Sequence, residues 1–338
     1  MRYPNFINKN STIGLIAPSM GSNKNPYRIR LQEGIKYFQN KGVNIKKGHH
    51  LFVNKKASSD SAINRAKDFY SFYRNKHVDF VWSIGGGEIM MDILPYIDFQ
   101  KIAKLPAKYF SGYSDNTNLT FLLTTICDIA TIYGLHIGDF ASKPLHQENL
   151  DYEDLLCGKK LKFTNYDYYQ KESLKDANPL SHLNLTEKVS YKSINMENTN
   201  TFSGRIIGGC LDILTMLCGT KYDKVEAFLE KYKNDGFIWY FDSCDYHSIG
   251  FYRAILQLKY ANYFKYVKGF LIGRVGNPFE LLDFTFLEAI EKVLKPLNVP
   301  IIYDVDIGHV SPSFPIINGA IATINYENNK FEIEYKLV

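Results

Sequence analysis

The chain has 338 residues, of which 45% are hydrophobic and 22% charged, a composition typical of a globular protein and too apolar for a disordered one. Its 40 basic and 35 acidic residues leave a net charge of +5, which is too dilute for a nucleic-acid-binding surface. No apolar run approaches the roughly 20 residues that span a bilayer. The sequence therefore predicts neither a nucleic-acid nor a membrane partner.

The cysteines and the N-terminus bear on the cellular compartment. The five cysteines are odd in number and show no CxxC spacing, so neither a disulfide framework nor a zinc site is predicted. The N-terminus lacks a basic region leading into a hydrophobic signal segment. We therefore expect a reduced, cytoplasmic protein without a metal.

In the first 142 residues, short apolar runs alternate with helical patterns. The runs predict strands at residues 12–17, 43–46, 79–84, 108–111 and 129–133. Helices are expected from Pro26 to a C-terminal cap at Gly42, and from a cap at Asp60 or Ser61 through Tyr73. This alternation predicts a parallel sheet with helices on both faces.

The rest of the chain divides into two parts. Residues 143–200 are polar, rich in Lys, Asn and Tyr, and predict a long connection that could carry a hairpin. In residues 201–338, strands are expected at 236–241, 268–275 and 300–305, helices at 251–264 and 279–294, and a closing hairpin from 321–326 and 331–335. The predicted fold is α/β: a doubly wound, flavodoxin-like domain at 1–142, a connecting segment, and a smaller α/β domain with a β-rich closing segment at 201–338.

Three polar residues each follow a predicted strand: Ser114, Asp242 and His309. Ligands of α/β folds bind at the carboxyl ends of strands, so these side chains could converge. Ser114 lies in GYSDNT, and a strand, a tight turn and a helix are typical of a nucleophile elbow, although Asn116 replaces the usual second glycine. Taken singly, the three residues could equally be a helix cap, a strand-ending turn residue and a hydrogen-bonded histidine.

The glycine run Gly85–Gly87 follows a predicted strand. Such a run can cradle a phosphate, or supply N–H groups to an oxyanion hole or a substrate carboxylate. SIGGGE is neither GxGxxG nor a P-loop. The residues alone leave open a serine hydrolase and a nucleotide or sugar-phosphate binder, including a nucleotide-dependent transferase.

The ordered motifs together resemble the LD-carboxypeptidase family of serine peptidases. The segments that carry the resemblance are TIGLIAPS, SIGGGEIMMDILPYIDF, LPAKYFSGYSDNTNL, FSGRIIGGCLDILTMLCGTKY, GFLIGRV and IGHVSPSFPIINGA. They cover nearly the whole chain, and GYSD and GH are the most specific. The family includes cytoplasmic murein tetrapeptide carboxypeptidases and microcin C self-immunity proteins, and SIGGGE looks closer to the self-immunity branch.

The resemblance implies a Ser–His–Glu triad that acts by acyl transfer without a metal or cofactor. Ser114 matches the nucleophile and His309 the general base, whereas the acid falls on Asp242, one methylene shorter than the family's Glu. Asp245 is the alternative acid. The oxyanion would be bound by backbone N–H groups of Gly86, Gly87 and Asp115.

The resemblance also predicts the partners. Glu88, His136 and Asp245 are expected to line the substrate site, and the substrate to be a small peptide or a peptidyl-nucleotide conjugate. Tyr166, Tyr168 and Tyr169 could stack on an adenine, although ordinary loop packing explains them as well. A homodimer is expected from the resemblance alone. The departure at Asp242 leaves one alternative, a catalytically weak or inactive homologue that binds a small molecule.

Overall fold

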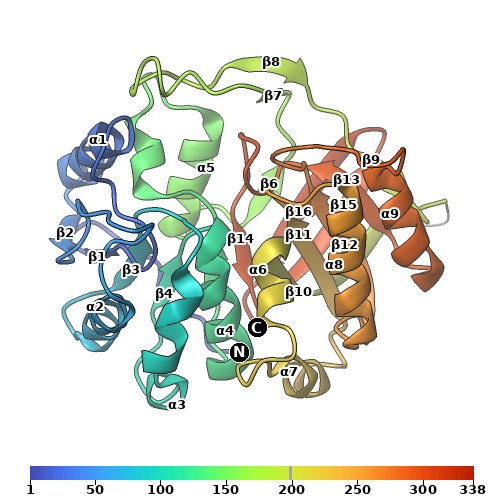
Figure 1. Cartoon of the computed structure of the whole chain (residues 1–338), viewed down its shortest axis with the longest axis horizontal. Coiled ribbons are helices and arrows are strands. Elements are labelled where there is room, and N and C mark those ends of the chain that lie inside the picture. Colours follow the sequence, from blue (N-terminus) through green and yellow to red (C-terminus); the bar gives the residue numbers. More distant parts are fainter. Residues whose placement is uncertain (198–199) are drawn as a thin grey trace.

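A computed structural model describes residues 1–197 and 200–338 and shows two sheets side by side (Figure 1). The strands of the first sheet are β1 (Thr12–Ile16), β2 (Asn44–Lys47), β3 (Phe80–Ser83), β4 (Tyr109–Ser111), β5 (Thr131–Tyr133) and β14 (Ile316–Asn318). Their order is β14-β5-β4-β3-β1-β2, and all neighbours are parallel except β14 and β5. The order of β2-β1-β3-β4-β5 is that of a flavodoxin-like sheet, as predicted.

The second sheet is mixed. Its strands are β6 (Lys162–Thr164), β9 (Lys192–Ile194), β10 (Thr201–Cys210), β11 (Phe237–Asp242), β12 (Val267–Gly273), β13 (Ile301–Val305), β15 (Ile321–Glu327) and β16 (Lys330–Lys336). In the order β6-β16-β15-β10-β11-β12-β13-β9, the four strands β10 to β13 are parallel and the flanking pairs antiparallel. The predicted closing hairpin is β15–β16. The long strand β10 was not predicted from the sequence.

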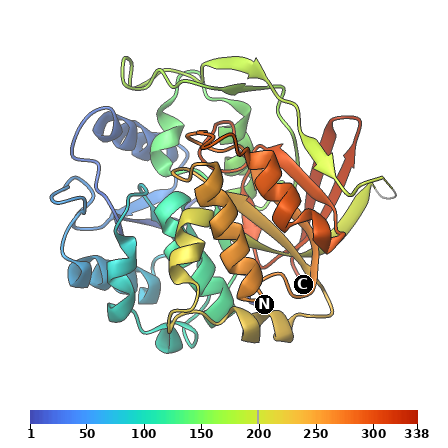
Figure 2. The same cartoon turned by 45° about the vertical axis from the view of Figure 1, so that its right-hand side comes forward.

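Helices cover both sheets. They are α1 (Tyr27–Asn40), α2 (Ala62–Arg74), α3 (Phe99–Ile102), α4 (Thr117–Cys127), α5 (Gln147–Leu156), α6 (Leu211–Leu217), α7 (Val225–Lys231), α8 (Ser248–Tyr260) and α9 (Phe286–Val293). Helices α6, α8 and α9 lie side by side on one face of the second sheet (Figure 2). No helix among the described residues has the length and apolar character needed to cross a membrane.

Helix α9 is shorter than the predicted helix at 279–294. It begins at Phe286 because Thr285 and Glu288 form a capping box, in which the Thr285 side chain accepts a hydrogen bond from the Glu288 N–H and the Glu288 carboxylate accepts one from the Thr285 N–H. The preceding residues form a loop that exposes Phe279 and Leu282. The predicted helix was too long because the apolar periodicity of the sequence continues through the residues of this loop.

Helix α4 joins the two halves of the molecule. It contacts β5 of the first sheet and also β10 and α6 of the second half. Leu119, Phe121, Leu122 and Leu123 are all buried, as expected for a helix that is covered on every side. Each such side chain stabilises the fold by about 1.5–3 kcal/mol. The start of α4 is therefore a fixed point between the two sheets.

The connecting segment is more structured than predicted. It contains α5, β6, β9 and a separate hairpin of β7 (Tyr168–Gln170) and β8 (Leu185–Lys188), which arches over the top of the molecule in Figure 1. Gln170 N–H donates to Ser311 O at 2.9 Å, and an Arg30 guanidinium N–H from α1 donates to Pro179 O at 2.9 Å. The hairpin region thus contacts both halves. The domain limits at residues 142 and 200 stay a prediction.

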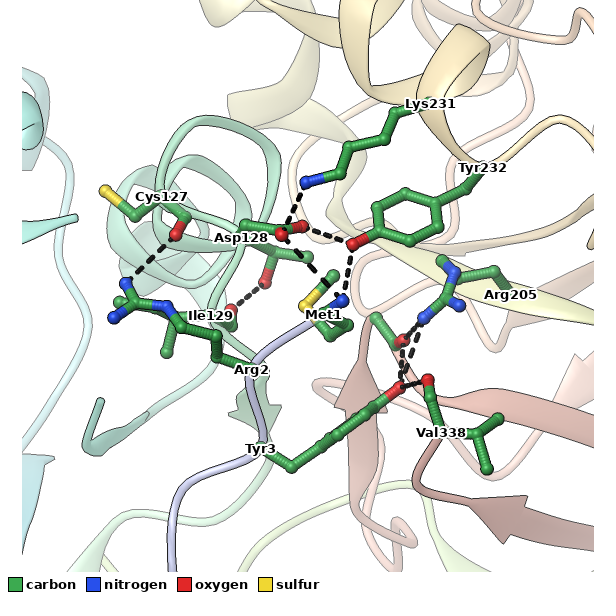
Figure 3. A network of polar contacts seen from close by, with 12 residues as sticks. Met1, Arg2, Tyr3, Cys127, Asp128, Ile129, Arg205, Lys231, Tyr232 and Val338 are labelled. Carbon is green, nitrogen blue, oxygen red and sulfur yellow. Dashed lines mark hydrogen bonds and ion pairs between the residues drawn. The ribbon is translucent and has the colours of Figure 1, made fainter. Parts of the chain in front are cut away.

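The first and last described residues meet at the opposite end of the molecule from this hairpin (Figures 1 and 3). The Met1 ammonium group donates to the Tyr232 hydroxyl at 2.5 Å, and that hydroxyl donates to Asp128 at 2.6 Å. The Tyr3 hydroxyl donates to the Val338 carbonyl oxygen at 2.9 Å. These bonds connect the turn before β5 with the end of α7, and so tie the two halves together far from the carboxyl ends of the parallel strands.

Candidate active site

The backbone at Ser114 is bent in the manner of a nucleophile elbow. Ser114 follows β4 and opens a short 3-10 turn that leads into α4. Its φ is +64°, the left-handed region that L-residues rarely adopt and that costs about 1–3 kcal/mol. At the N-terminus of this turn, and at that of α4, no side chain makes a capping hydrogen bond to the backbone. The interpretation of Ser114 as a helix cap therefore has no support.

His309 and Asp242 meet Ser114 although they come from another sheet. The Ser114 Oγ lies 2.9 Å from Nε2 of His309, and Nδ1 of His309 lies 2.7 Å from Oδ2 of Asp242. Asp242 ends β11 and is completely buried, whereas His309 follows β13. The His309 N–H also donates to Asp242 Oδ1 at 3.2 Å.

Gly308 explains how the short aspartate reaches the imidazole. Gly308 has a φ of +91°, and a Cβ on it would lie 2.0 Å from both Cγ and Oδ1 of Asp242. Only glycine allows the loop to approach the carboxylate so closely. The loop that carries His309 therefore lies directly against the Asp242 carboxylate.

Opposing effects set the pKa of His309. Burial of the ring lowers it, but the negative charge of Asp242 and the bond between the two groups more than compensate, with a further contribution from Cys244. Together they raise the pKa of His309 well above its ordinary value of 6.5.

Tyr133, which the sequence analysis did not single out, lies between the same groups. Its hydroxyl donates to Asp242 Oδ2 at 2.6 Å and accepts the Ser114 N–H at 3.1 Å. Tyr133 is a polar residue at the end of a buried strand, β5. The same signal selected Asp242 and could have selected Tyr133.

The glycine loop lies against the elbow. A Cβ on Gly86 would lie 3.1 Å from Ser114 Oγ and 3.8 Å from the Asp115 nitrogen, so Gly86 borders the nucleophile directly. The buried Asp115 carboxylate accepts hydrogen bonds from the Ser19 hydroxyl and the Met90 N–H, which ties both flanks of the loop to the elbow. Burial raises the pKa of Asp115. Gly87 follows Gly86 in the same loop, where a Cβ would collide with Ser19 Oγ at 2.3 Å.

Carboxylates gather near the site. Glu88 and Asp245 are exposed, and the pKa of Glu88 is raised by partial burial and by the charges of Asp245, Asp115 and Asp212. Asp212 accepts hydrogen bonds from the N–H groups of Cys244 at 3.3 Å and Asp245 at 3.1 Å, which fixes the loop after β11. Asp242, not Asp245, is the carboxylate that the structure places against His309.

His136 belongs to the wall of the site. Its ring stacks on Tyr113 with centroids 4.5 Å apart, and Tyr113 in turn packs edge-on against His309 at 5.3 Å. Burial lowers the pKa of His136 to about 4, so the ring is neutral at neutral pH. Its Nε2 lies 3.2 Å from the Asn116 side-chain nitrogen.

The three tyrosines of the connecting segment have different surroundings. Tyr166 is buried and its hydroxyl donates to Asp151 at 3.0 Å, whereas Tyr168 is half-exposed. The ring of Tyr169 lies 4.4 Å from the guanidinium carbon of Arg274. Loop packing accounts for Tyr166, and stacking on an adenine stays a prediction for the other two.

Among the residues that the structure describes, no group of three or more His, Cys, Asp or Glu side chains is arranged to hold a metal ion.

Comparison with known protein families defines the class of the protein. The LD-carboxypeptidase N-terminal domain matches residues 13–134, and the LD-carboxypeptidase C-terminal domain matches residues 203–324. The chain therefore belongs to the LD-carboxypeptidase family of serine peptidases, as the motifs predicted.

Relatives match along nearly the whole chain. A Vibrio cholerae protein named as a carboxypeptidase is 25% identical over 349 residues, with 100% of this chain and 99% of the relative covered. The microcin C7 self-immunity protein MccF of Escherichia coli is 25% identical and covers 95% of this chain and 92% of its own. A Bacillus subtilis protein named as a murein peptide carboxypeptidase is 26% identical, with coverages of 98% and 94%.

Solved structures confirm the two-part α/β fold. An MccF-like protein from Bacillus anthracis superimposes with a TM-score of 0.84 at 22% identity, covering 99% of this chain and 100% of that one. MccF in complex with glutamyl sulfamoyl guanosine gives a TM-score of 0.81 at 19% identity, with 98% of each chain covered.

Proposed function

We propose that this chain is a serine hydrolase that cleaves a C-terminal amide or related acyl bond, with Ser114 as nucleophile, His309 as general base and Asp242 as acid. The observation that carries the proposal is the unbroken line from Ser114 Oγ to His309 at 2.9 Å and from His309 to Asp242 at 2.7 Å. Family membership supports the same class of reaction.

The geometry suggests how the reaction proceeds. Ser114 Oγ attacks the substrate carbonyl carbon while His309 Nε2 takes the hydroxyl proton, and the buried charge of Asp242 stabilises the imidazolium. In this proposal, backbone N–H groups of Asp115 and of the Gly86–Gly87 segment, which borders Ser114, bind the oxyanion. His309 then protonates the leaving amine, and water, deprotonated by the same imidazole, hydrolyses the ester at Ser114.

The inactive-homologue alternative rests on the shorter acid at position 242 and on Asn116 in place of the usual second glycine of the elbow. The distance of 2.7 Å between Asp242 Oδ2 and His309 Nδ1 supports the catalytic proposal over this alternative. A chain kept only for binding would have no need for a left-handed serine aligned with a histidine. Catalysis is the function that these contacts favour.

The rate should depend on pH through His309. The base must be neutral, and the pKa of His309 is raised well above 6.5, so kcat/KM should rise with pH through that raised value. Stability should change in the opposite sense: the paired imidazolium stabilises the fold fully below about pH 6.5, and this contribution is lost as the pH rises through the raised pKa. Initial rates and thermal unfolding over a pH series test both signs. A half-maximal rate below pH 6.5 would contradict the assignment.

A methyl group on Gly86 should block the reaction. Gly86→Ala places a Cβ 3.1 Å from Ser114 Oγ, where the substrate carbonyl must enter, so kcat/KM should fall by at least about 100-fold. Gly85→Ala is the matched control, since the nearest atom to its Cβ would be Met20 O at 3.9 Å. Steady-state kinetics of both variants distinguish the positions. Equal losses would mean that the loop, rather than the entry to Ser114, had been disturbed.

The substrate is the finer part of the proposal. Relatives are named for murein peptide carboxypeptidase activity and for microcin self-immunity, and solved MccF structures contain glutamyl sulfamoyl guanosine and aspartyl sulfamoyl adenosine. We propose a small peptide or peptidyl-nucleotide conjugate as the substrate. Dimer formation and a cytoplasmic location stay predictions.

One competition experiment separates the two substrate classes. The native protein and a Ser114→Ala variant each receive a mixture of murein tetrapeptide and an aminoacyl-sulfamoyl adenosine, and products are identified by mass spectrometry. Loss of terminal D-Ala with the native protein alone indicates a murein carboxypeptidase, and cleavage of the adenosine conjugate alone indicates the self-immunity type. Cleavage of neither would count against both substrate classes.

A further inference from the structure

The hydroxyl group of Tyr133 contacts both ends of the Ser114–His309–Asp242 line. It accepts the Ser114 backbone N–H at 3.1 Å and donates to Asp242 Oδ2 at 2.6 Å. The carboxylate oxygen that it contacts also faces His309 Nδ1 at 2.7 Å. Tyr133 therefore shares one acceptor atom with the general base.

The bond to Asp242 crosses between the halves of the molecule, whereas the bond to Ser114 stays within the first half. Tyr133 and Ser114 belong to the first sheet and the turn after it, whereas Asp242 ends β11 of the second sheet. Tyr133 is buried, with 2% of its surface exposed, so water does not compete for its hydroxyl. A hydrogen bond to a buried carboxylate is strong, and its loss leaves a buried charge partly unpaired.

The bond to Ser114 has a second consequence. The Ser114 backbone is in the left-handed region, and its N–H is held by Tyr133 instead of by a helix or strand partner. The same hydroxyl thus fixes the backbone of the nucleophile and the carboxylate that orients the base.

We propose that Tyr133 is a positioning residue of this site, which sets the nucleophile of one sheet against the acid of the other. The inference rests on the proposed function and deepens it. Tyr133 does not touch the reacting atoms; it acts through Ser114 and Asp242.

The test replaces the hydroxyl alone. In Tyr133→Phe the ring stays and both hydrogen bonds are lost. The matched control is Tyr240→Phe, because the Tyr240 ring packs against Tyr133 with centroids 5.5 Å apart and its buried hydroxyl, which faces Asn318, makes no hydrogen bond to Ser114, His309 or Asp242 in the described structure. The ionisable groups that face Tyr133 or His309 in the described structure are Asp242, Cys210, Tyr240, Cys244, His136, Glu88 and Tyr113.

The readout is the rate of labelling by a fluorophosphonate, which needs no knowledge of the substrate. Ser114 Oγ attacks phosphorus, fluoride leaves, and the hydroxyl proton passes to His309. We expect Tyr133→Phe to be labelled about 10- to 100-fold more slowly than the native protein. Its half-maximal rate should also move to higher pH, since Asp242, without the competing donor, holds the imidazolium more tightly. Tyr240→Phe should match the native rate within about 2-fold at the native pH dependence.

The outcomes separate the two claims. A native protein that is not labelled contradicts the proposed function itself. A labelled native protein with a Tyr133→Phe rate within about 3-fold of it, or a slower rate at an unchanged half-maximal pH, overturns the positioning role. If Tyr133→Phe does not fold, 3-fluorotyrosine at position 133 keeps the shape and makes the hydroxyl a better donor. The half-maximal pH should then fall, and an unchanged value overturns the inference.

Discussion

Replacing Ser114 with alanine should abolish turnover while leaving the fold intact. Ser114 supplies the atom that forms the acyl bond, and in serine hydrolases the loss of the nucleophile lowers kcat by about 10⁶-fold. Among the described residues, the Ser114 hydroxyl has one side-chain hydrogen-bond partner, His309, so the free energy of unfolding should change by about 1 kcal/mol or less. Steady-state kinetics and thermal unfolding measure the two effects separately.

The control for Ser114→Ala is a hydroxyl-to-alanine variant in the helix that follows the elbow. Thr125→Ala on α4 removes a buried hydroxyl that donates to the Phe121 carbonyl one turn earlier, and the variant should turn over like the native protein. Residual activity of Ser114→Ala above about one thousandth of native would identify a different nucleophile.

Asp242→Asn should be the second most damaging substitution. The amide keeps the shape of the carboxylate but removes its charge, so the imidazolium loses its stabilising partner, and comparable changes in serine proteases lower kcat by about 10⁴-fold. Without the opposing charge, burial dominates the pKa of His309, which should fall. The pH at which kcat/KM is half-maximal should therefore move to a lower value, although kcat itself is much reduced.

Asp245→Asn is the matched comparison, because Asp245 was the alternative acid in the sequence. Its side chain is exposed and lies near Glu88, so its replacement should change KM and leave kcat within about 3-fold of native. A larger loss of kcat in Asp245→Asn than in Asp242→Asn would reverse the assignment of the acid.

Local sequence patterns predicted most of the first sheet and the strands β11 to β13. Apolar runs such as DFVWSI and GFIWYF are long enough to identify buried strands, and turn residues mark their ends. The ten-residue strand β10 was not predicted because its sequence, TFSGRIIGGC, contains three glycines, which weaken the strand pattern. Two of them allow close packing: a Cβ on Gly208 would collide with the β11 backbone, and one on Gly209 with Thr117.

The site itself was only partly predictable. The sequence identified three candidate residues because each follows a strand, namely Ser114, Asp242 and His309. The distances between them depend on the tertiary fold alone. Two contacts could not be predicted, the close approach of Gly308 to Asp242 and the bond from the Tyr133 hydroxyl to Asp242, because they join segments about 70 and 110 residues apart.

The central claim is that Ser114 is a nucleophile activated by His309. The most direct test is peptide mapping by tandem mass spectrometry after treatment with a fluorophosphonate. We expect a single phosphonyl adduct on Ser114 in the native protein and none in a His309→Ala variant that remains folded. An adduct on another residue, or equal labelling of Ser114 in both proteins, would contradict the account.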